Sequence, residues 1–235
     1  MTTVTALSAL SALVLLTLSV PAFWPDYLAK PAAADAYTHA HALLGLLWLL
    51  ALVAQPLLVR ARRIRQHRAL GRIAVAVGVA FVVSGLLLTH HRVSRMPAAD
   101  FAAHGFGFYL PLLMTGVFAA ALVQGWRWRR VMPLHARYMA CTLLALVDPV
   151  TARLMYFHAP PPPAFFVNQL PAFVIVVAVL VALWRTLPAS ASAPGRRGFA
   201  GFAVAVGGLF LLYGVTPYSP AWLAFLEWFR ALPLT

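Results

Sequence analysis

Charge and cysteine are scarce in this sequence. Only 10% of its 235 residues are charged, against 63% hydrophobic residues, which is too little charge to cover the surface of a soluble domain. Cys141 is the single cysteine, which excludes an internal disulfide, a cysteine-based zinc or iron–sulfur site and a covalent C-x-x-C-H haem attachment. Lys30 is the single lysine and lies in a predicted loop, which excludes a retinal protein with a buried Schiff-base lysine. Motifs of the common hydrolases and nucleotide-binding enzymes are also missing.

Long apolar runs make up most of the chain. Windows of about 20 apolar residues, the length that crosses a bilayer core of about 30 Å, define the candidate spans. These spans cover residues 4–23, 37–59, 73–91, 104–125, 136–157, 165–186 and 199–217. No basic segment precedes the first of them, so we expect a retained helix and not a cleaved signal peptide. The sequence therefore predicts an all-α integral membrane protein with about seven transmembrane helices, forming a single transmembrane domain over residues 1–235.

The uneven distribution of arginine predicts the orientation. Thirteen of the 18 basic residues fall between spans two and three, four and five, or six and seven, and short loops rich in arginine stay in the cytoplasm. We expect a bacterial inner (plasma) membrane protein with its amino terminus in the cytoplasm and its carboxyl terminus outside. The net charge of +13 then marks topology, and no nucleic-acid partner is expected. Residues 219–234 are too short to span and predict an interfacial helix.

A weak repeat relates the two central hairpins. His67 opens the segment His-Arg-Ala-Leu-Gly-Arg and is followed 23 residues later by His90; His135 opens His-Ala-Arg-Tyr-Met-Ala and is followed 23 residues later by His158. Each preceding helix ends in a glutamine, Gln55 or Gln124. If the repeat is a true duplication, spans two to five form a four-helix core over residues 37–158 that is lined with histidines.

Helical phase distinguishes the two histidines of span two. His39 and His41 are about 200° apart around a helix, so only one of them faces the bundle. His41, Trp48 and Gln55 recur at intervals of seven residues and form one polar and aromatic stripe. His39 instead shares a face with leucines. We therefore expect His41 to point inward.

The placement of the histidines over residues 37–158 resembles that of cytochrome b561-like membrane proteins, in which a four-helix core holds two b-type haems between paired histidines. Carried onto this sequence, the resemblance implies that His41 and His104 ligate an outer haem and that His67 and His135 ligate an inner one. Neutral imidazole suits iron, and neighbouring arginines would pair with the haem propionates. The resemblance thus implies a membrane electron-transfer protein or oxidoreductase. The expected partners are the lipid bilayer and a quinone or another redox partner, and a homo-oligomer or a larger membrane complex stays open.

Two other interpretations stay open. One is a haem-free site in a membrane enzyme or metal-handling protein, in which histidines bind zinc, iron or copper. The candidate ligands for such a site are His39, His90, His91 and His158, with His104 and Asp100 on the same short loop as His90 and His91. The other is a structural or assembly subunit whose histidines sit in the membrane interface. The start of span three is also similar to uncharacterised small bacterial membrane proteins with a His-Arg-x-Leu-Gly-Arg segment, which implies no chemistry.

Asp148 and Arg153 are the acid and the arginine that fall inside a predicted span, so both are candidate catalytic residues. They are five residues apart, about 140° around a helix, so each is expected to find a partner on another helix. A proton relay or a quinone contact is one interpretation, and ion pairs that lock the bundle are the other. Pro149 is expected to release a backbone carbonyl near residue 145 and to open the helix there.

Overall fold

The computed structural model describes residues 3–159, 165–189 and 191–235, and every regular element that they form is a helix. The predicted all-α fold is confirmed. The long helices are α1 (Thr3–Phe23), α2 (Ala36–Arg60), α3 (Ile64–Ser94), α5 (Tyr109–Arg127), α8 (Phe165–Arg185) and α9 (Ala193–Leu211). The shorter ones are α4 (Ala98–His104), α6 (Met132–Cys141), α7 (Leu144–His158) and α10 (Pro220–Arg230). Single turns of other helix types occur at Trp24–Leu28, Pro31–Ala33, Gly105–Phe108, Leu212–Gly214 and Thr216–Tyr218.

Most predicted spans agree with these helices to within a few residues. Among the described residues, six helices are long and apolar enough to cross a membrane, and Gln169–Arg185 is a shorter apolar helix. The main difference is α3, which begins at Ile64, nine residues before the predicted start at residue 73. Its first two turns are rich in arginine and form helix without being apolar, so a hydropathy window does not include them.

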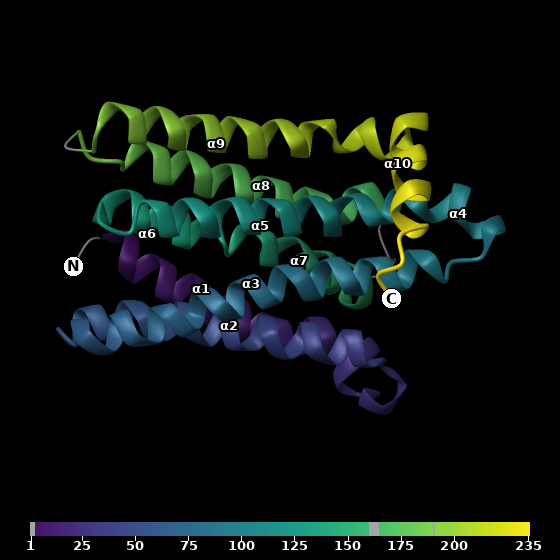
Figure 1. Ribbon diagram of the computed structural model, residues 1–235, viewed down its shortest axis with the longest axis horizontal. Coiled ribbons are helices and arrows are strands. Elements are labelled where there is room, and N and C mark those ends of the chain that lie inside the picture. Colours follow the sequence, from purple (N-terminus) through teal and green to yellow (C-terminus); the bar gives the residue numbers. More distant parts are fainter. Residues whose placement is uncertain (1–2, 160–164, 190) are drawn as a thin grey trace.

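The long helices lie side by side along one direction, with the amino terminus at one end of the bundle and the carboxyl terminus at the other (Figure 1). The α2–α3, α5–α6 and α8–α9 connections share one end, which we call the arginine-rich end because it carries residues 60–72, 126–137 and 185–198. Helix α10 runs across the opposite end. It buries Leu226 and Phe229 and exposes Trp228, which is the division of surfaces expected of an interfacial helix.

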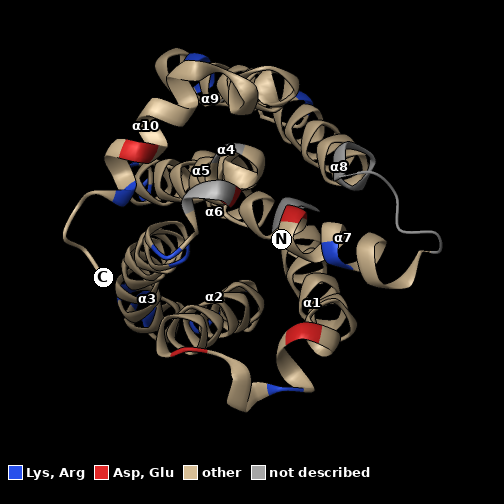
Figure 2. Ribbon diagram, turned by 90° about the vertical axis from the view of Figure 1, so that its right-hand side faces the viewer, with Lys and Arg blue, Asp and Glu red and all other residues tan. Residues whose placement is uncertain are grey.

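The end-on view shows how the helices enclose the interior (Figure 2). Helix α2 packs against α3, α3 against α5, and α5 against α6 and α7. Helix α1 packs against both α2 and α7 and so completes a ring with the four predicted core spans. Helices α8 and α9 form an outer layer, in which α8 packs against α7 and α9 against α8.

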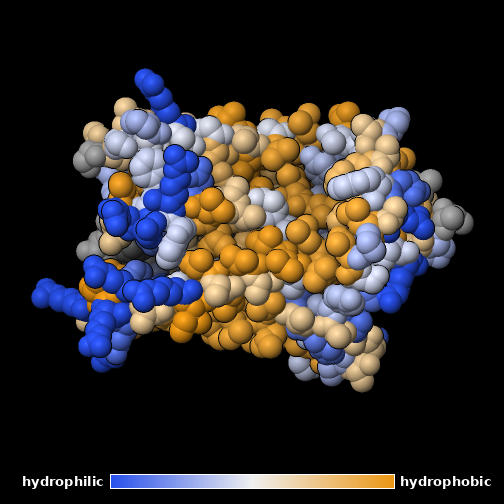
Figure 3. All heavy atoms as spheres, in the orientation of Figure 1, coloured by the Kyte–Doolittle hydropathy of each residue, from blue (hydrophilic) through white to orange (hydrophobic). Residues whose placement is uncertain are grey.

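The outer surface of the bundle is apolar over its middle part. Figure 3 shows a hydrophobic band between two more hydrophilic ends. Val204, Leu211 and Val174 are 75%, 71% and 61% exposed. A continuous exposed apolar band of this kind is rare on soluble proteins. The band and the apolar helices are consistent with a lipid bilayer around the protein.

Trp48 occupies the centre of the ring and is 1% exposed. Its indole Nε1 donates to the hydroxyl of Thr142 at 3.1 Å, and its ring meets that of Phe118 edge-on at 5.0 Å. Gly78 of α3 permits this packing, because a Cβ atom there would lie 2.8 Å from the indole ring. The interior is therefore closely packed where α2, α3 and α5 meet.

The fifth span is interrupted at Thr142 and Leu143, between α6 and α7. Pro149 had been expected to open the helix near residue 145, but α7 continues through the proline. At the observed break, the Thr142 hydroxyl donates to the carbonyl of Met139 at 2.7 Å while it accepts from Trp48. The interruption thus lies where the polar edge of Trp48 needs a partner.

Candidate functional site at the arginine-rich end

His67 and His135 occupy equivalent positions in the two central hairpins. Each is the fourth residue of its helix, because α3 begins at Ile64 and α6 begins at Met132. Each follows a short connection at the arginine-rich end, and each is half-buried. The two histidine segments that suggested a repeat in the sequence therefore start their helices in the same register.

The ring of His67 is fixed by the end of the preceding helix. The side-chain amide of Gln55, on α2, donates to Nδ1 of His67 and to its backbone carbonyl, the latter at 3.2 Å. The amide oxygen of Gln55 accepts from the backbone N–H of Gly71 at 2.9 Å. All hydrogen-bonding groups of the Gln55 side chain thus serve to hold the first turns of α3.

The ring of His135 is fixed in a corresponding way by the end of α5. Its Nδ1 donates to the backbone carbonyl of Gly125 at 2.8 Å. Gly125 allows α6 to approach closely, since a Cβ atom there would lie 3.3 Å from Cγ of Met139. The neighbouring Gln124 has a buried amide oxygen without a hydrogen-bond partner among the described residues.

The two imidazoles lie at the same end of the bundle, on α3 and α6, and helix α5 packs on both of these helices. In the described part of the chain, Nε2 of His67 and Nε2 of His135 take part in no hydrogen bond. His135 donates from Nδ1 and so keeps a lone pair on Nε2, the form in which proteins present imidazole to a metal or to haem iron. His67 accepts at Nδ1, so its neutral ring carries the proton on Nε2.

The structure does not bring together His41 and His104, the pair that the resemblance implies for an outer haem. His41 faces α3, as its helical phase predicts: its ring stacks on Phe81 at 4.4 Å, and its Nδ1 lies 2.9 Å from the hydroxyl of Ser84. His104 is exposed at the end of α4, where its Nδ1 lies 3.2 Å from the carbonyl oxygen of Asp100. The described contacts include none between the two rings. The turn at Gly105–Phe108 lies between His104 and α5, so His104 is not the first residue of that helix as predicted.

The remaining histidines each have a different partner at the opposite end. His39 bonds to the hydroxyl of Tyr27 at 3.0 Å, and Nε2 of His158 bonds to the carbonyl of Pro21 at 3.1 Å. His91 lies 3.7 Å from Asp35 and contacts Arg95. Across the described ranges, no three His, Cys, Asp or Glu side chains are grouped so that they could hold a metal ion.

His90 is the most deeply buried histidine, at 1% exposure. Its Nδ1 lies 2.7 Å from the hydroxyl of Thr235, and its ring meets Phe229 of α10 edge-on at 5.3 Å. Its Nε2 is buried without a partner among the described residues. His90 therefore belongs to the contact between α3 and the carboxyl-terminal segment, and His91 and His104 point to other partners.

Asp35 caps the amino end of α2 and lies just outside that membrane-spanning helix. Its carboxylate accepts from the backbone N–H of Thr38 at 2.7 Å. Burial raises the pKa of Asp35, but the hydrogen bonds from Thr38 and the charge of His91 outweigh this effect and hold the pKa below its usual value.

Asp148 and Arg153, the two candidate catalytic residues, lie on α7 and do not bond to each other. Arg153 pairs with Asp26 at 3.4 Å, donates to the carbonyl of Pro149 at 3.1 Å and covers the ring of Phe23. Arg153 thereby joins α7 to the segment that follows α1. This agrees with the expectation from helical phase that Arg153 finds its partner outside its own helix. Asp148 is 8% exposed, and its Oδ1 has no hydrogen-bond partner in the described part of the chain.

Arg137 is a polar core residue that the sequence did not single out. It is 4% exposed and donates to the backbone carbonyls of Leu183 and Pro133, both at 2.9 Å, and to the carbonyl of Thr186. Leu183 lies in the last turn of α8, where backbone carbonyls have no helical partner. Arg137 therefore caps α8 from α6, two residues after His135.

No protein-family model, curated protein or solved structure matches this chain. The assignment of function therefore depends on the residues of the site and on their chemistry. The paired histidines at the arginine-rich end are the arrangement with the clearest chemical meaning.

Proposed function

We propose that the chain is a membrane electron-transfer protein that binds one b-type haem between His67 and His135. The observation that carries the proposal is the position of these two histidines, each the fourth residue of a helix that begins at the arginine-rich end and packs on α5. A b-type haem bound there would supply reversible one-electron transfer. This keeps the inner pair that the resemblance implies and omits the outer one, because His104 does not approach His41.

His135 has the form required for axial ligation of haem iron, and His67 would reach it by one change. His135 donates its Nδ1 proton to the carbonyl of Gly125, which leaves a lone pair on Nε2. For His67 to bind through Nε2, its proton must move to Nδ1, which then needs an acceptor. A half-turn of the Gln55 amide would supply its oxygen as that acceptor, at the expense of the bonds from Gln55 to the His67 carbonyl and from Gly71 to Gln55. The buried, unpartnered oxygen of Gln124 is a second acceptor at the same end.

The proposed topology has seven transmembrane helices, with the arginine-rich end in the cytoplasm of a bacterial cell. Helix α8 then forms the seventh span together with the six longer helices. An odd number of spans agrees with the positions of the two termini at opposite ends of the bundle (Figure 1). The excess of arginine at one end supports a cytoplasmic location for that end.

Haem binding is tested on the full chain, expressed with an adequate haem supply and purified in mild detergent. The expected result is a b-type α band in the reduced-minus-oxidised spectrum and about one haem per chain, one axial pair binding one iron. His67→Ala and His135→Ala should each abolish the band. His41→Ala and His104→Ala are the matched controls and should retain it. A colourless protein, or equal loss in all four variants, would overturn the proposal.

A further inference from the structure

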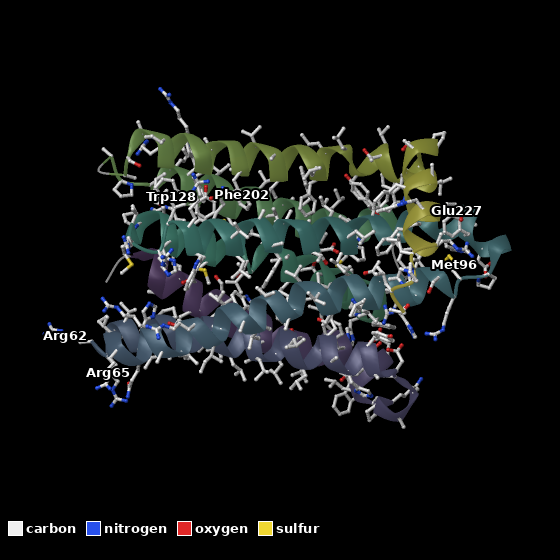
Figure 4. All side chains as sticks on the ribbon, in the orientation of Figure 1. Arg62, Arg65, Met96, Trp128, Phe202 and Glu227 are labelled. Atoms are coloured by element: carbon white, nitrogen blue, oxygen red, sulfur yellow. The ribbon has the colours of Figure 1, made fainter. Side chains whose placement is uncertain are left out.

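Three arginines near the start of α3 form a second feature of the arginine-rich end. Arg65, Arg68 and Arg72 line a surface hollow of about 450 Å³ together with Ile64 and Ala69. The arginines fall within an arc of about 60° around the helix, and His67 lies about 130° from the centre of that arc. The hollow therefore faces away from the proposed haem site. Figure 4 shows Arg65, like Arg62, projecting outward from this end of the bundle.

These arginines have no partner in the described part of the chain. Arg65, Arg68 and Arg72 take part in no hydrogen bond or ion pair there. Other arginines at the same end are satisfied by the chain itself: Arg137 by carbonyls of α8, and Arg196 by the carbonyls of Leu187 and Pro188.

No acidic residue is available to neutralise the hollow. Residues 60–72, 126–137 and 185–198 contain neither aspartate nor glutamate. The five acidic residues of the chain all lie in other segments: Asp26, Asp35, Asp100, Asp148 and Glu227. Grouped arginines without carboxylates predict an anion from outside the chain, and the guanidinium group is suited to phosphate oxygens.

An exposed apolar stripe continues the hollow along α3. Ala76, Val79 and Val83 follow Arg72 on the same face of the helix, at steps of four, three and four residues. Ala76 is exposed, and Val79 and Val83 are 53% and 49% exposed. Arg72 immediately precedes the apolar run that starts at residue 73. Charge and apolar surface thus meet at the level where a lipid headgroup joins its acyl chains.

We propose that this surface binds an anionic phospholipid, with the phosphate of its headgroup against Arg65, Arg68 and Arg72 and an acyl chain along Ala76, Val79 and Val83. Charge complementarity selects the headgroup, and the exposed stripe distinguishes a lipid from a free phosphate. The inference does not depend on haem, since the hollow and His67 lie on different faces of α3.

The test is a titration of the full chain in detergent with dioleoyl phosphatidylglycerol, followed by native mass spectrometry. Dioleoyl phosphatidylcholine and inorganic phosphate are the comparison ligands. The variant Arg65→Gln/Arg68→Gln/Arg72→Gln should weaken binding of the first phosphatidylglycerol about a hundredfold, at about fivefold per arginine. The matched control Arg60→Gln/Arg62→Gln/Arg63→Gln removes as many charges from the same connection but none from the hollow. It should weaken binding by less than about threefold, as expected of distant, screened charges.

Three results would overturn the lipid site: equal weakening in both triple variants, equal binding of phosphatidylcholine, or complete displacement of the lipid by inorganic phosphate. Circular dichroism and gel filtration check that each variant is folded. If the triple variant does not fold, Arg72→Gln alone should weaken binding about fivefold, and an unchanged affinity would contradict the site. The same lipid affinity is expected in His135→Ala, so failure of haem binding and failure of lipid binding give different results.

Discussion

The two ends of the bundle neutralise their charges in different ways. At the opposite end, acids and bases lie together: Asp26 pairs with Arg153, Asp35 with His91 and Glu227 with Arg230. The segments at the arginine-rich end contain no aspartate or glutamate. Their basic side chains bond to backbone carbonyls or to Gln55, or have no partner in the described part of the chain. The opposite end is thus balanced internally. The arginine-rich end is the one whose chemistry calls for ligands from outside.

The histidines follow the same division. Those at the opposite end are each bound to a different neighbour, which suits a role in fixing loops and helix ends. His67 and His135 instead occupy equivalent positions, and the preceding helix holds Nδ1 in both: Gln55 donates to His67, and His135 donates to the carbonyl of Gly125. The number of histidines at an end is therefore a poor guide to a cofactor site, and the way in which their rings are anchored is a better one.

The strongest test of this comparison replaces one arginine at each end. Arg137→Leu should lower the free energy of unfolding by about 3 kcal/mol, because it removes the hydrogen bonds of a buried guanidinium group to the carbonyls of Leu183, Thr186 and Pro133. Arg153→Leu should cost less than about 1 kcal/mol, since the Arg153 and Asp26 side chains are 29% and 42% exposed. The free energy of unfolding of each variant is measured in mixed micelles with an increasing fraction of dodecyl sulfate. Similar losses in the two variants would contradict the difference between the ends.

A smaller effect is expected where α10 meets α3. Thr235→Val removes the hydroxyl that bonds to His90 and leaves both nitrogens of a buried ring without a partner. We expect a cost of about 1–2 kcal/mol, confined to this contact. Hydrogen exchange should become faster in Pro220–Arg230 while α5 and α6 stay protected. Unchanged exchange in α10 would show that the bond does not fasten this helix.

The smallest expected effect concerns pH and Asp35. Its folded-state pKa lies below its usual value, so the ionised carboxylate stabilises the fold at neutral pH, and this contribution is lost as the pH falls through the lowered pKa. Asp35→Asn keeps a capping side chain but does not titrate. The difference in melting temperature between the two proteins should therefore be constant near neutral pH and change only in strongly acidic solution. A difference that changes between pH 6 and pH 8 would contradict the assignment to Asp35.

Helical phase predicted local features of this fold well where the helix is continuous. The seven-residue stripe of α2 placed His41 toward α3, and the structure shows Trp48 and Gln55 of that stripe in the interior and at His67. His39 and the leucines that share its face are exposed, including Leu43 at 57%. A single helix fixes the relation between these side chains, so no knowledge of its neighbours is needed.

The predictions that assumed a continuous helix elsewhere were less accurate. His104 was assigned to the start of span four, but the turn around Gly105 and Gly107 places it on α4. Glycines before an apolar run allow such a change of direction, although hydropathy does not register it. The opening expected near residue 145 is found at Thr142 and Leu143, just before α7, and the hydroxyl of Thr142 pairs there with Trp48 from 94 residues away in the chain. Contacts between distant segments cannot be deduced from local spacing.

Arg137 illustrates what the sequence leaves undetermined. It was counted among the residues that mark the cytoplasmic side, and nothing in its neighbourhood distinguishes it from Arg127 or Arg130. Its burial follows from acceptors on α8, 46 and 49 residues further along the chain. The pairing of His67 with His135 was implied by the resemblance, whereas the anchoring of their rings by Gln55 and Gly125 became visible only in three dimensions.

The interruption between α6 and α7 also changes how residues of the fifth span relate to one another. His135 lies on the segment before Thr142 and Asp148 on the segment after it. Between the two segments the backbone bonds run from Thr142 to Met139 and from Leu143 to Ala140, a tighter winding than that of the α-helix. The angle of about 100° per residue therefore does not hold across Thr142, and the helix face of His135 cannot be extended by counting residues to Asp148.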